Sequence, residues 1–355
     1  METAKYDGFI PVNFAPLGTT EISVYNSDGK RVGGFLPQKL RLPRLGEKLY
    51  SCGVLSDVHI TGTASNAISK NFQNALKYLN ETECVNSIFI CGDLTQNGTL
   101  DELQAYKNYV GTYSPNVPVY AITGNHEYKT TFDVANRISE YTGQPLYYTV
   151  KQGDDVFIML GIASATKGSL FADGELQWFY ERLEENRNKR CFVFTHVFPP
   201  SKKDADGKLN PKRCGNALEL YHTDLWGDDE QTIFESLLYR YPNVILFHGH
   251  SHFKFGMQEF DKTANYGKDF KGHSVHIPSV SMPTYNSGSI ESQKYEYDYN
   301  ASEGYVMDVY RNHIILKGMD FKNGKYLPIA HYCLDTTIKK VGVGTYVDST
   351  GTIKT

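Results

Sequence analysis

The sequence of 355 residues lacks long apolar runs, a basic leader and an excess of positive charge. No segment approaches the ~18 consecutive apolar residues of a membrane-spanning helix, so we expect no membrane partner. The N-terminal residues do not join a basic stretch to an apolar one, so no signal peptide is visible. The formal net charge of −4 disfavours a nucleic-acid partner bound through bulk positive charge. The sequence leaves the oligomeric state open.

Paired cysteines are also missing. The six cysteines are far apart, and none belongs to a Cys-x-x-Cys pair. Cys52, Cys91 and Cys191 stand in apolar, strand-like runs. Unpaired, buried thiols are typical of a reducing compartment. We therefore expect reduced thiols and a cytoplasmic location, although a chain whose signal peptide had been removed would look the same.

The chain divides into three regions by composition. Residues 1–46 contain several prolines, an alternating run over 21–25 and few large apolar residues, which predicts a short β-rich arm or appendage. Residues 47–335 are expected to form the main domain, and residues 336–355 a C-terminal β tail. Neither internal repeats nor low-complexity segments interrupt the main domain.

Within the main domain, strand-like and helix-like runs alternate. Buried strands are predicted over 50–55, 87–91, 117–122, 155–162, 191–195 and 244–247. Helical spacing of apolar residues occurs over 64–79, 100–110, 175–185 and 233–239. Towards the C-terminus the pattern is β, over 274–277, 304–310, 313–316 and 342–347. This alternation predicts an α/β fold with a mainly parallel sheet covered by helices.

Residues of metal-ligand type follow five of these strands. They are Asp57 and His59, then Asp93, then Asn125 with His126, then His196, and finally His250 with His252. Ligands of open α/β sheets bind beyond the carboxyl ends of the strands, so these residues are expected to converge. Their mixture of carboxylate, imidazole and amide oxygen suits two divalent metals that share one carboxylate.

These five blocks, in this order, resemble the calcineurin-like metallophosphoesterase superfamily, from about Leu49 to at least His252. The segment 277–283 and the C-terminal β pattern resemble the continuation in its cyclic-nucleotide-phosphodiesterase-like branch. The resemblance implies a metallophosphoesterase fold, which is a four-layer α/β/β/α sandwich, here with a short N-terminal β appendage. It also implies a dinuclear metal centre.

The resemblance further implies a role for each block. The first metal would take Asp57, His59 and His252, the second would take Asn125, His196 and His250, and Asp93 would bridge both. His126 would be catalytic, facing the phosphate and assisting the leaving oxygen. A hydroxide between the metals would attack phosphorus in line. Manganese, iron and zinc all suit these ligands, and the ligand types alone do not choose among them.

Two departures from the family pattern indicate which branches of the superfamily the chain resembles. Many members carry an aspartate three residues after the bridging one, where it can orient the catalytic histidine, and here Gln96 stands instead. Gln96 could orient His126 by a hydrogen bond but would stabilise its cation less well. Purple acid phosphatases have a tyrosine ligand there, so Gln96 argues against a purple Fe(III) site. Ile60 replaces the glycine of the protein serine/threonine phosphatases, which favours the small-molecule and phosphodiesterase branches.

Two long segments near the motifs could recognise the substrate. Segment 201–226 contains Lys202, Lys203, Lys208, Lys212, Arg213, Tyr221 and Trp226, and segment 263–299 contains Tyr266, Tyr285, Tyr295, Tyr297 and Tyr299. Lysines could bind phosphate and tyrosines could stack a base, but for any one of them we favour a solvated surface position. The histidines outside the motifs are expected to be structural, with His248 a buried neighbour of His250.

The sequence therefore predicts a dinuclear-metal phosphoester hydrolase. Its expected partner is a small phosphoester, and a phosphodiesterase acting on a nucleotide-like substrate is favoured. A phosphomonoesterase of the same fold is the alternative within this class. The alternative from another class is a catalytically silent interaction scaffold, whose mark would be missing ligands, and none is missing.

Overall fold

The computed structural model describes residues 45–130, 133–166, 168–199, 225–255, 273–286 and 295–338. It also describes four short strands near the ends of the chain. These are β1 (Ile22–Tyr25) paired with β2 (Arg31–Phe35), and β16 (Tyr346–Val347) paired with β17 (Ile353–Lys354), both antiparallel. The strand expected over 21–25 is thus present, but the separation of arm and tail from the main domain stays a prediction.

The first large sheet has six strands in the order β15-β14-β13-β3-β4-β5. Its parallel part comprises β3 (Lys48–Leu55), β4 (Ser87–Ile90) and β5 (Val119–Ala121). Its antiparallel part comprises β13 (Glu303–Tyr310), β14 (His313–Asp320) and β15 (Lys325–Asp335). The C-terminal strands therefore extend the sheet that the first strands begin.

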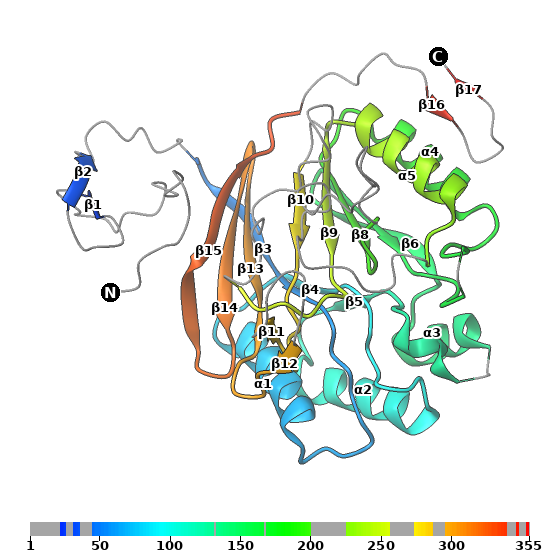
Figure 1. The fold of residues 1–355 in the computed structure, drawn as a ribbon, viewed down its shortest axis with the longest axis horizontal. Helices are drawn as coiled ribbons and strands as arrows, with labels where there is room; N and C mark the ends of the chain where they lie inside the picture. Colours follow the sequence, from blue (N-terminus) through cyan, green and yellow to red (C-terminus); the bar gives the residue numbers. More distant parts are fainter. Residues whose placement is uncertain are drawn as a thin grey trace.

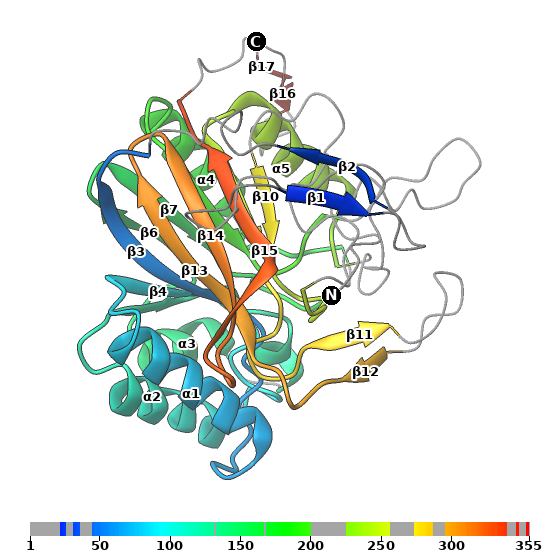
Figure 2. The ribbon, with the colours of Figure 1, turned by 90° about the vertical axis from the view of Figure 1, so that its left-hand side faces the viewer.

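The second large sheet has five strands in the order β10-β9-β8-β7-β6. The strands β7 (Asp155–Leu160), β8 (Cys191–Thr195), β9 (Val244–His248) and β10 (His273–His276) are parallel, and β6 (Tyr147–Gln152) pairs antiparallel with β7. A small hairpin, β11 (Thr284–Asn286) with β12 (Tyr295–Tyr297), projects sideways from the body of the molecule (Figure 2).

The two sheets face each other, and aromatic rings fill the space between them. Phe89 of β4 stacks on Phe157 of β7 with ring centroids 4.1 Å apart and parallel planes. Phe194 of β8 and Phe247 of β9 continue this stack at 4.9 Å from each other. All four rings are fully buried, so the sheets are joined by an apolar layer of the kind that dominates folding free energy.

Helices cover the other face of each sheet. α1 (Ala67–Glu81), α2 (Leu100–Tyr113) and α3 (Val134–Thr142) pack in one apolar cluster with the first sheet. α4 (Glu175–Glu185) and α5 (Asp228–Arg240) pack in another with the second. Figure 1 shows these helices as two separate groups. None of the helices in the described ranges is long and apolar enough to cross a membrane.

The expected α/β class is confirmed. The alternation of strands and helices indicated a mainly parallel sheet covered by helices, and the chain builds two mixed sheets, each packed against its own group of helices. Each combines a parallel part with antiparallel strands at an edge, and the C-terminal β region supplies three of these strands to the first sheet.

Candidate metal centre

The loops that follow β3, β4, β8 and β9 are tied to one another by backbone hydrogen bonds. The amides of Val58 and His59 donate to the Asp93 carbonyl at 2.8 and 2.9 Å, and the Gly249 amide donates to the His196 carbonyl at 3.1 Å. Strands that end side by side thus deliver their loops to one place. Asn125 joins them just before the short 3₁₀ helix His126–Lys129.

An unusual backbone conformation marks these loops. In the part of the chain that the structure describes, six residues other than glycine have a positive φ angle. Five of them are Asp57, His59, Asp93, His250 and His252, with φ between 50° and 77°. Left-handed backbone costs an ordinary residue roughly 1–2 kcal/mol. Such strain is typical of functional sites, where the surrounding structure enforces it.

The side chains of these loops form two groups that share one member. Asp57, His59, Asp93 and His252 offer ligand atoms within 4.8 Å of one another, and Asp93, His196 and His250 do the same. Asp57, His59 and His196 are fully buried, and Asp93 is nearly so. The residues therefore form a candidate dinuclear site for divalent metal, with Asp93 common to both halves.

The carboxylates lie at the centre of the histidines. Asp93 Oδ2 is 3.2 Å from His196 Nε2 and 3.4 Å from His59 Nε2. Asp57 Oδ1 is 3.1 Å from His252 Nε2. The other oxygen of each carboxylate accepts a backbone hydrogen bond, at 2.8 Å from the His126 amide for Asp93 and at 3.0 Å from the His250 amide for Asp57. One oxygen of each is thus held by the fold while the other faces the histidines.

Several buried polar atoms here lack the hydrogen bonds that buried atoms normally make. Asn125 Oδ1 is buried without a hydrogen-bond partner, and Asp57 Oδ1 and His196 Nε2 are buried with only the histidine–carboxylate contacts given above. His59 Nε2 and His252 Nε2 approach each other to 2.9 Å. Oxygen and imidazole nitrogen are ligands of first-row divalent metals, so this donor set fits a pair of metal ions.

Hydrogen bonds on the far side of two imidazoles fix which nitrogen faces the centre. His196 Nδ1 lies 2.6 Å from the Cys91 carbonyl and must donate to it, so in the neutral ring the lone pair is on Nε2. His59 Nδ1 lies 3.1 Å from Gln96 Oε1 and donates there in the same way. Such outer partners fix the tautomer that a metal requires.

The charges of the centre shift its pKa values in opposite directions. Burial lowers the pKa of His196, but the carboxylates of Asp93 and Asp57 outweigh it and raise the pKa to about 10. Burial and the neighbouring His252 lower the pKa of His59 to about 4. Burial acts to raise the pKa of both aspartates, yet the surrounding histidines hold it below its usual range. The carboxylates are therefore charged at neutral pH.

His126 stands at the edge of this centre, with Nε2 4.0 Å from Asp93 Oδ2. Its Nδ1 lies 2.9 Å from two groups, the Gln96 backbone carbonyl and Lys129 Nζ. The carbonyl requires a proton on Nδ1, whereas the ammonium requires a lone pair, so only one of the two can be a hydrogen bond at a time. The Gln96 side chain, which could have oriented His126, instead contacts His59.

Two residues of this region have roles that the sequence reasoning did not assign. Lys129 brings a positive charge to His126, and only its place three residues further along the chain could have pointed to it. Glu127 is buried and accepts from the Thr95 amide, the Thr95 hydroxyl and the Gly124 amide at 2.7–2.9 Å. It thereby ties the loop that carries Asp93 to the loop that carries Asn125.

Other residues singled out from the sequence lie elsewhere. Trp226 is buried in the core against Phe171, so it is not a surface residue near the substrate. His248 is buried, as expected, and packs near His276 with ring centroids 5.5 Å apart. The positions outside the described residues are Lys202, Lys203, Lys208, Lys212, Arg213, Tyr221, His222 and Tyr266.

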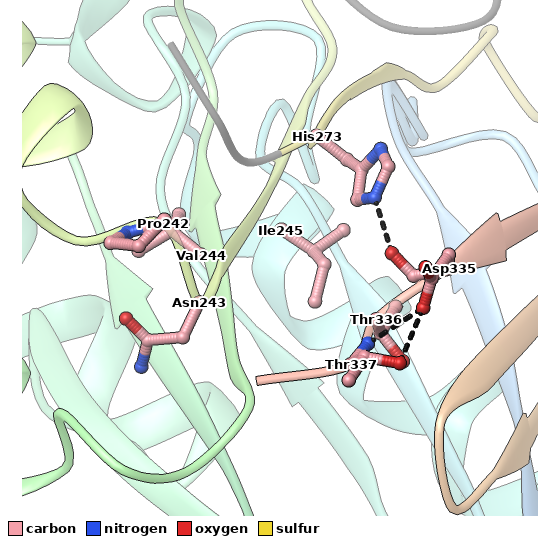
Figure 3. Close-up of a pocket in the computed structure, with 8 residues that line it drawn as sticks. All are labelled: Pro242, Asn243, Val244, Ile245, His273, Asp335, Thr336 and Thr337. Carbon is pink, nitrogen blue, oxygen red and sulfur yellow. Dashed lines mark hydrogen bonds between the residues drawn. The ribbon is translucent and has the colours of Figure 1, made fainter. Parts of the chain in front are cut away.

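A small cavity lies at the start of β9 and β10, the opposite end of these strands from the candidate centre (Figure 3). It is lined by Pro242, Asn243, Val244, Ile245, His273, Asp335, Thr336 and Thr337. Its polar atoms bond one another: His273 Nε2 lies 2.8 Å from the Asp335 carbonyl, and the Thr337 amide donates to Asp335 Oδ1 at 2.9 Å. We therefore assign it no role in binding.

Comparison with known proteins agrees with this geometry. The family model described as calcineurin-like phosphoesterase matches residues 51–254. No significant match is found among curated protein sequences.

Two solved structures share the fold. A dimetal phosphatase from Danio rerio is 12% identical, with a TM-score of 0.55 over 82% of this chain and 100% of that chain. A purple acid phosphatase from yellow lupin (Lupinus luteus) seeds is 10% identical, with a TM-score of 0.50 over 81% of this chain and 53% of that chain.

Proposed function

Because this chain belongs to the calcineurin-like phosphoesterase family and is a phosphoric ester hydrolase, we propose that it hydrolyses a small, nucleotide-like phosphodiester. The observation that carries the proposal is the position of Asp93 in both groups of ligand atoms. A carboxylate shared by two ligand sets is what a pair of metal ions requires, and such pairs act on both the attacking and the leaving oxygen of phosphoryl transfer.

We assign the ligands as the family resemblance implies. Asp57, His59 and His252 would hold one ion, Asn125, His196 and His250 would hold the other, and Asp93 would be shared by both. When bound, the two ions supply Lewis-acid activation of the phosphoester and of a water molecule. The fold contributes by holding one oxygen of each aspartate and the far nitrogen of two histidines in fixed hydrogen bonds.

His126 is proposed to serve the leaving oxygen. If Lys129 donates to Nδ1, the proton of the neutral ring resides on Nε2, the nitrogen on the side of Asp93. Burial lowers the pKa of His126, and the Lys129 charge lowers it further, so the ring is neutral at neutral pH. A neutral ring with its proton on Nε2 can still donate a hydrogen bond to the departing oxygen.

Charge supports a diester over a monoester. At neutral pH a diester carries one negative charge and a monoester approaches two. The cation that contacts the centre in the described part of the chain is a single lysine, Lys129. Monoester sites commonly add bidentate arginine to hold the extra charge. The alternative remains a phosphomonoesterase, while the completeness of the ligand set argues against a silent scaffold.

The test is hydrolysis of bis-p-nitrophenyl phosphate against p-nitrophenyl phosphate, with Mn²⁺ and with EDTA. Metal-dependent turnover that favours the diester supports the proposal, and D93A is expected to abolish it. Preference for the monoester would move the assignment to a phosphatase. Two bound ions without turnover on either compound would contradict the proposed activity on simple diesters.

A further inference from the structure

The hairpin β11–β12 is fastened to the loop that carries His252. The Thr284 amide donates to the His252 carbonyl at 2.8 Å, and the Lys254 amide donates to the Thr284 carbonyl at 2.9 Å. Directly after β12, the Asp298 amide donates to the Pro283 carbonyl at 2.7 Å. Figure 2 shows the hairpin reaching out beside the body of the molecule. Its base is therefore placed by the same loop that positions a metal ligand.

Two tyrosines at the end of the hairpin present their rings next to the candidate centre: Tyr297, the last residue of β12, and Tyr299, in the turn that follows it. Tyr297 lies with its ring centroid 6.5 Å from that of His252, and Tyr299 stacks near Tyr297 at 6.0 Å with planes 28° apart. Tyr297 is 53% exposed and Tyr299 is 43% exposed. A pair of ring surfaces is thus open to solvent beside the ligand His252.

An ion pair holds this pair of rings in place. Asp298, the residue between the two tyrosines, contacts Lys254 Nζ at 2.7 Å, and its Oδ1 accepts from the Asn300 amide at 3.0 Å. The lysine and this amide hold the pKa of Asp298 below its usual range despite partial burial, so the pair is charged at neutral pH. A rigid aromatic surface loses little conformational freedom when a ligand stacks on it.

We propose that Tyr297 and Tyr299 form a stacking surface for the base of a nucleotide whose phosphate lies at the metal centre. This inference rests on the proposed function and specifies its substrate class. Proteins that bind a base without hydrogen bonds to its edges usually stack it on an exposed aromatic side chain. Such stacking contributes ~1–3 kcal/mol of binding free energy per base. The surface is therefore expected to accept purine and pyrimidine alike.

A mononucleotide fits the observations better than a nucleic-acid strand. Two adjacent rings offer room for one base, whereas single-strand binders repeat aromatic groups along a positively charged groove. The net charge of −4 provides no such surplus of positive charge. Substrates with a phosphate but no flat ring lack the partner that this surface provides.

The test is calorimetric titration of the EDTA-treated and the Mn²⁺-loaded protein with AMP and with ribose 5-phosphate, which has the sugar and phosphate but no base. Wild type is expected to bind AMP at least about fivefold more tightly than ribose 5-phosphate. The ratio of the AMP affinity to the ribose 5-phosphate affinity should be unchanged in Y297F, because phenylalanine keeps the ring. In Y297L and Y297A, which lack the ring, this ratio should fall towards one. Y239A, which removes an exposed tyrosine of α5 on the far side of the second sheet, leaves it unchanged.

The results separate this inference from the proposed hydrolase activity. A wild-type ratio of one, or a ratio that survives in Y297L and Y297A, overturns the stacking surface even if simple diesters are hydrolysed. A ratio lost only in the variants without a ring supports the surface even if turnover is absent. Thermal unfolding of each variant shows whether the hairpin change has affected the fold.

Discussion

Gln96 accepts a hydrogen bond from His59, with Oε1 3.1 Å from Nδ1. The side chain at the position that the family pattern associates with the catalytic histidine thus contacts a proposed metal ligand, His59, instead. His126 is left to the Gln96 backbone carbonyl and to Lys129. We therefore expect the Gln96 side chain to affect metal binding more than proton transfer.

Q96A is accordingly expected to weaken metal binding about 10–100-fold, the usual effect of removing such an outer partner. Turnover at saturating Mn²⁺ should fall far less, because the ligand itself remains. Competition titration with a metallochromic chelator measures the affinity. Q104A, which removes an exposed glutamine of α2, is the matched control. Unchanged affinity in Q96A would show that the His59–Gln96 contact is dispensable.

The shared position of Asp93 predicts different metal contents for two ligand variants. D93A should retain less than one ion per chain, whereas H252A should retain about one, since His252 belongs to one group only. Both should lose at least about 100-fold in turnover, because metal-ion electrostatics supplies the activation. Elemental analysis after dialysis gives the stoichiometry. Equal metal loss in both variants would contradict the assignment of Asp93 to both halves.

Gly124 should not accept even one methyl group. A Cβ atom there would contact the backbone nitrogen and the carboxylate of Asp93, with Cγ at 2.8 Å. G124A is therefore expected to displace Asp93, to lose metal and to destabilise the fold by about 1–3 kcal/mol. G111A, in α2, meets no atom within 4 Å and should instead gain up to about 1 kcal/mol. Chemical denaturation compares the two, and tolerance of G124A would refute the close packing.

Glu175 should make the stability of the protein depend on pH. Burial and the nearby Glu230 raise its pKa well above the usual range, outweighing the favourable first turn of α4. The folded state then binds this proton more tightly than the unfolded state, so its contribution to stability falls as pH rises above the ordinary glutamate pKa.

E175Q removes that charge and is expected to raise the free energy of unfolding at pH 8 while leaving it nearly unchanged at pH 4. E181Q, at an exposed position of the same helix, should show no such difference. Urea denaturation at both pH values provides the measurement. An E175Q protein that is less stable than wild type at pH 8 would reverse the sign and refute the explanation.

Backbone strain at the ligands can be measured directly at His252, whose φ is 59°. H252G and H252A both lose the ligand, but only glycine adopts this conformation without cost. In EDTA, H252G should be more stable than H252A by about 1 kcal/mol, the reverse of the usual order of alanine and glycine. If H252A is the more stable in urea denaturation, the loop is not strained there.

The sequence predicted most of the elements that lie in the core. The strand over 191–195 and the helix over 175–185 have the bounds observed for β8 and α4. The apolar run of β8 is continuous because the strand is buried on both faces, and α4 carries its buried apolar residues at helical spacing. β6 and β15 were missed, and both are edge strands. β15 contains Pro328, which disfavours a strand except at an edge, where β15 lies.

At the candidate centre, the sequence predicted which loops converge, but it did not predict the side-chain contacts between these loops. The motif blocks after five strands indicated which loops converge, and the structure brings those loops together. The redirection of the Gln96 side chain to His59 depends on two backbone paths that no local pattern encodes. The approach of Lys129 to His126 requires the turn of the 3₁₀ helix, which is too short to leave a periodic signal.

The positive φ angles of five proposed metal ligands also bear on the evolution of the chain. Any copy whose chemistry ceased to matter could gain stability simply by replacing such residues with glycine, so ordinary mutational drift would erase these side chains early. Five of the seven proposed ligands keep their side chains at such positions, which is the pattern expected of a chain whose chemistry is still in use.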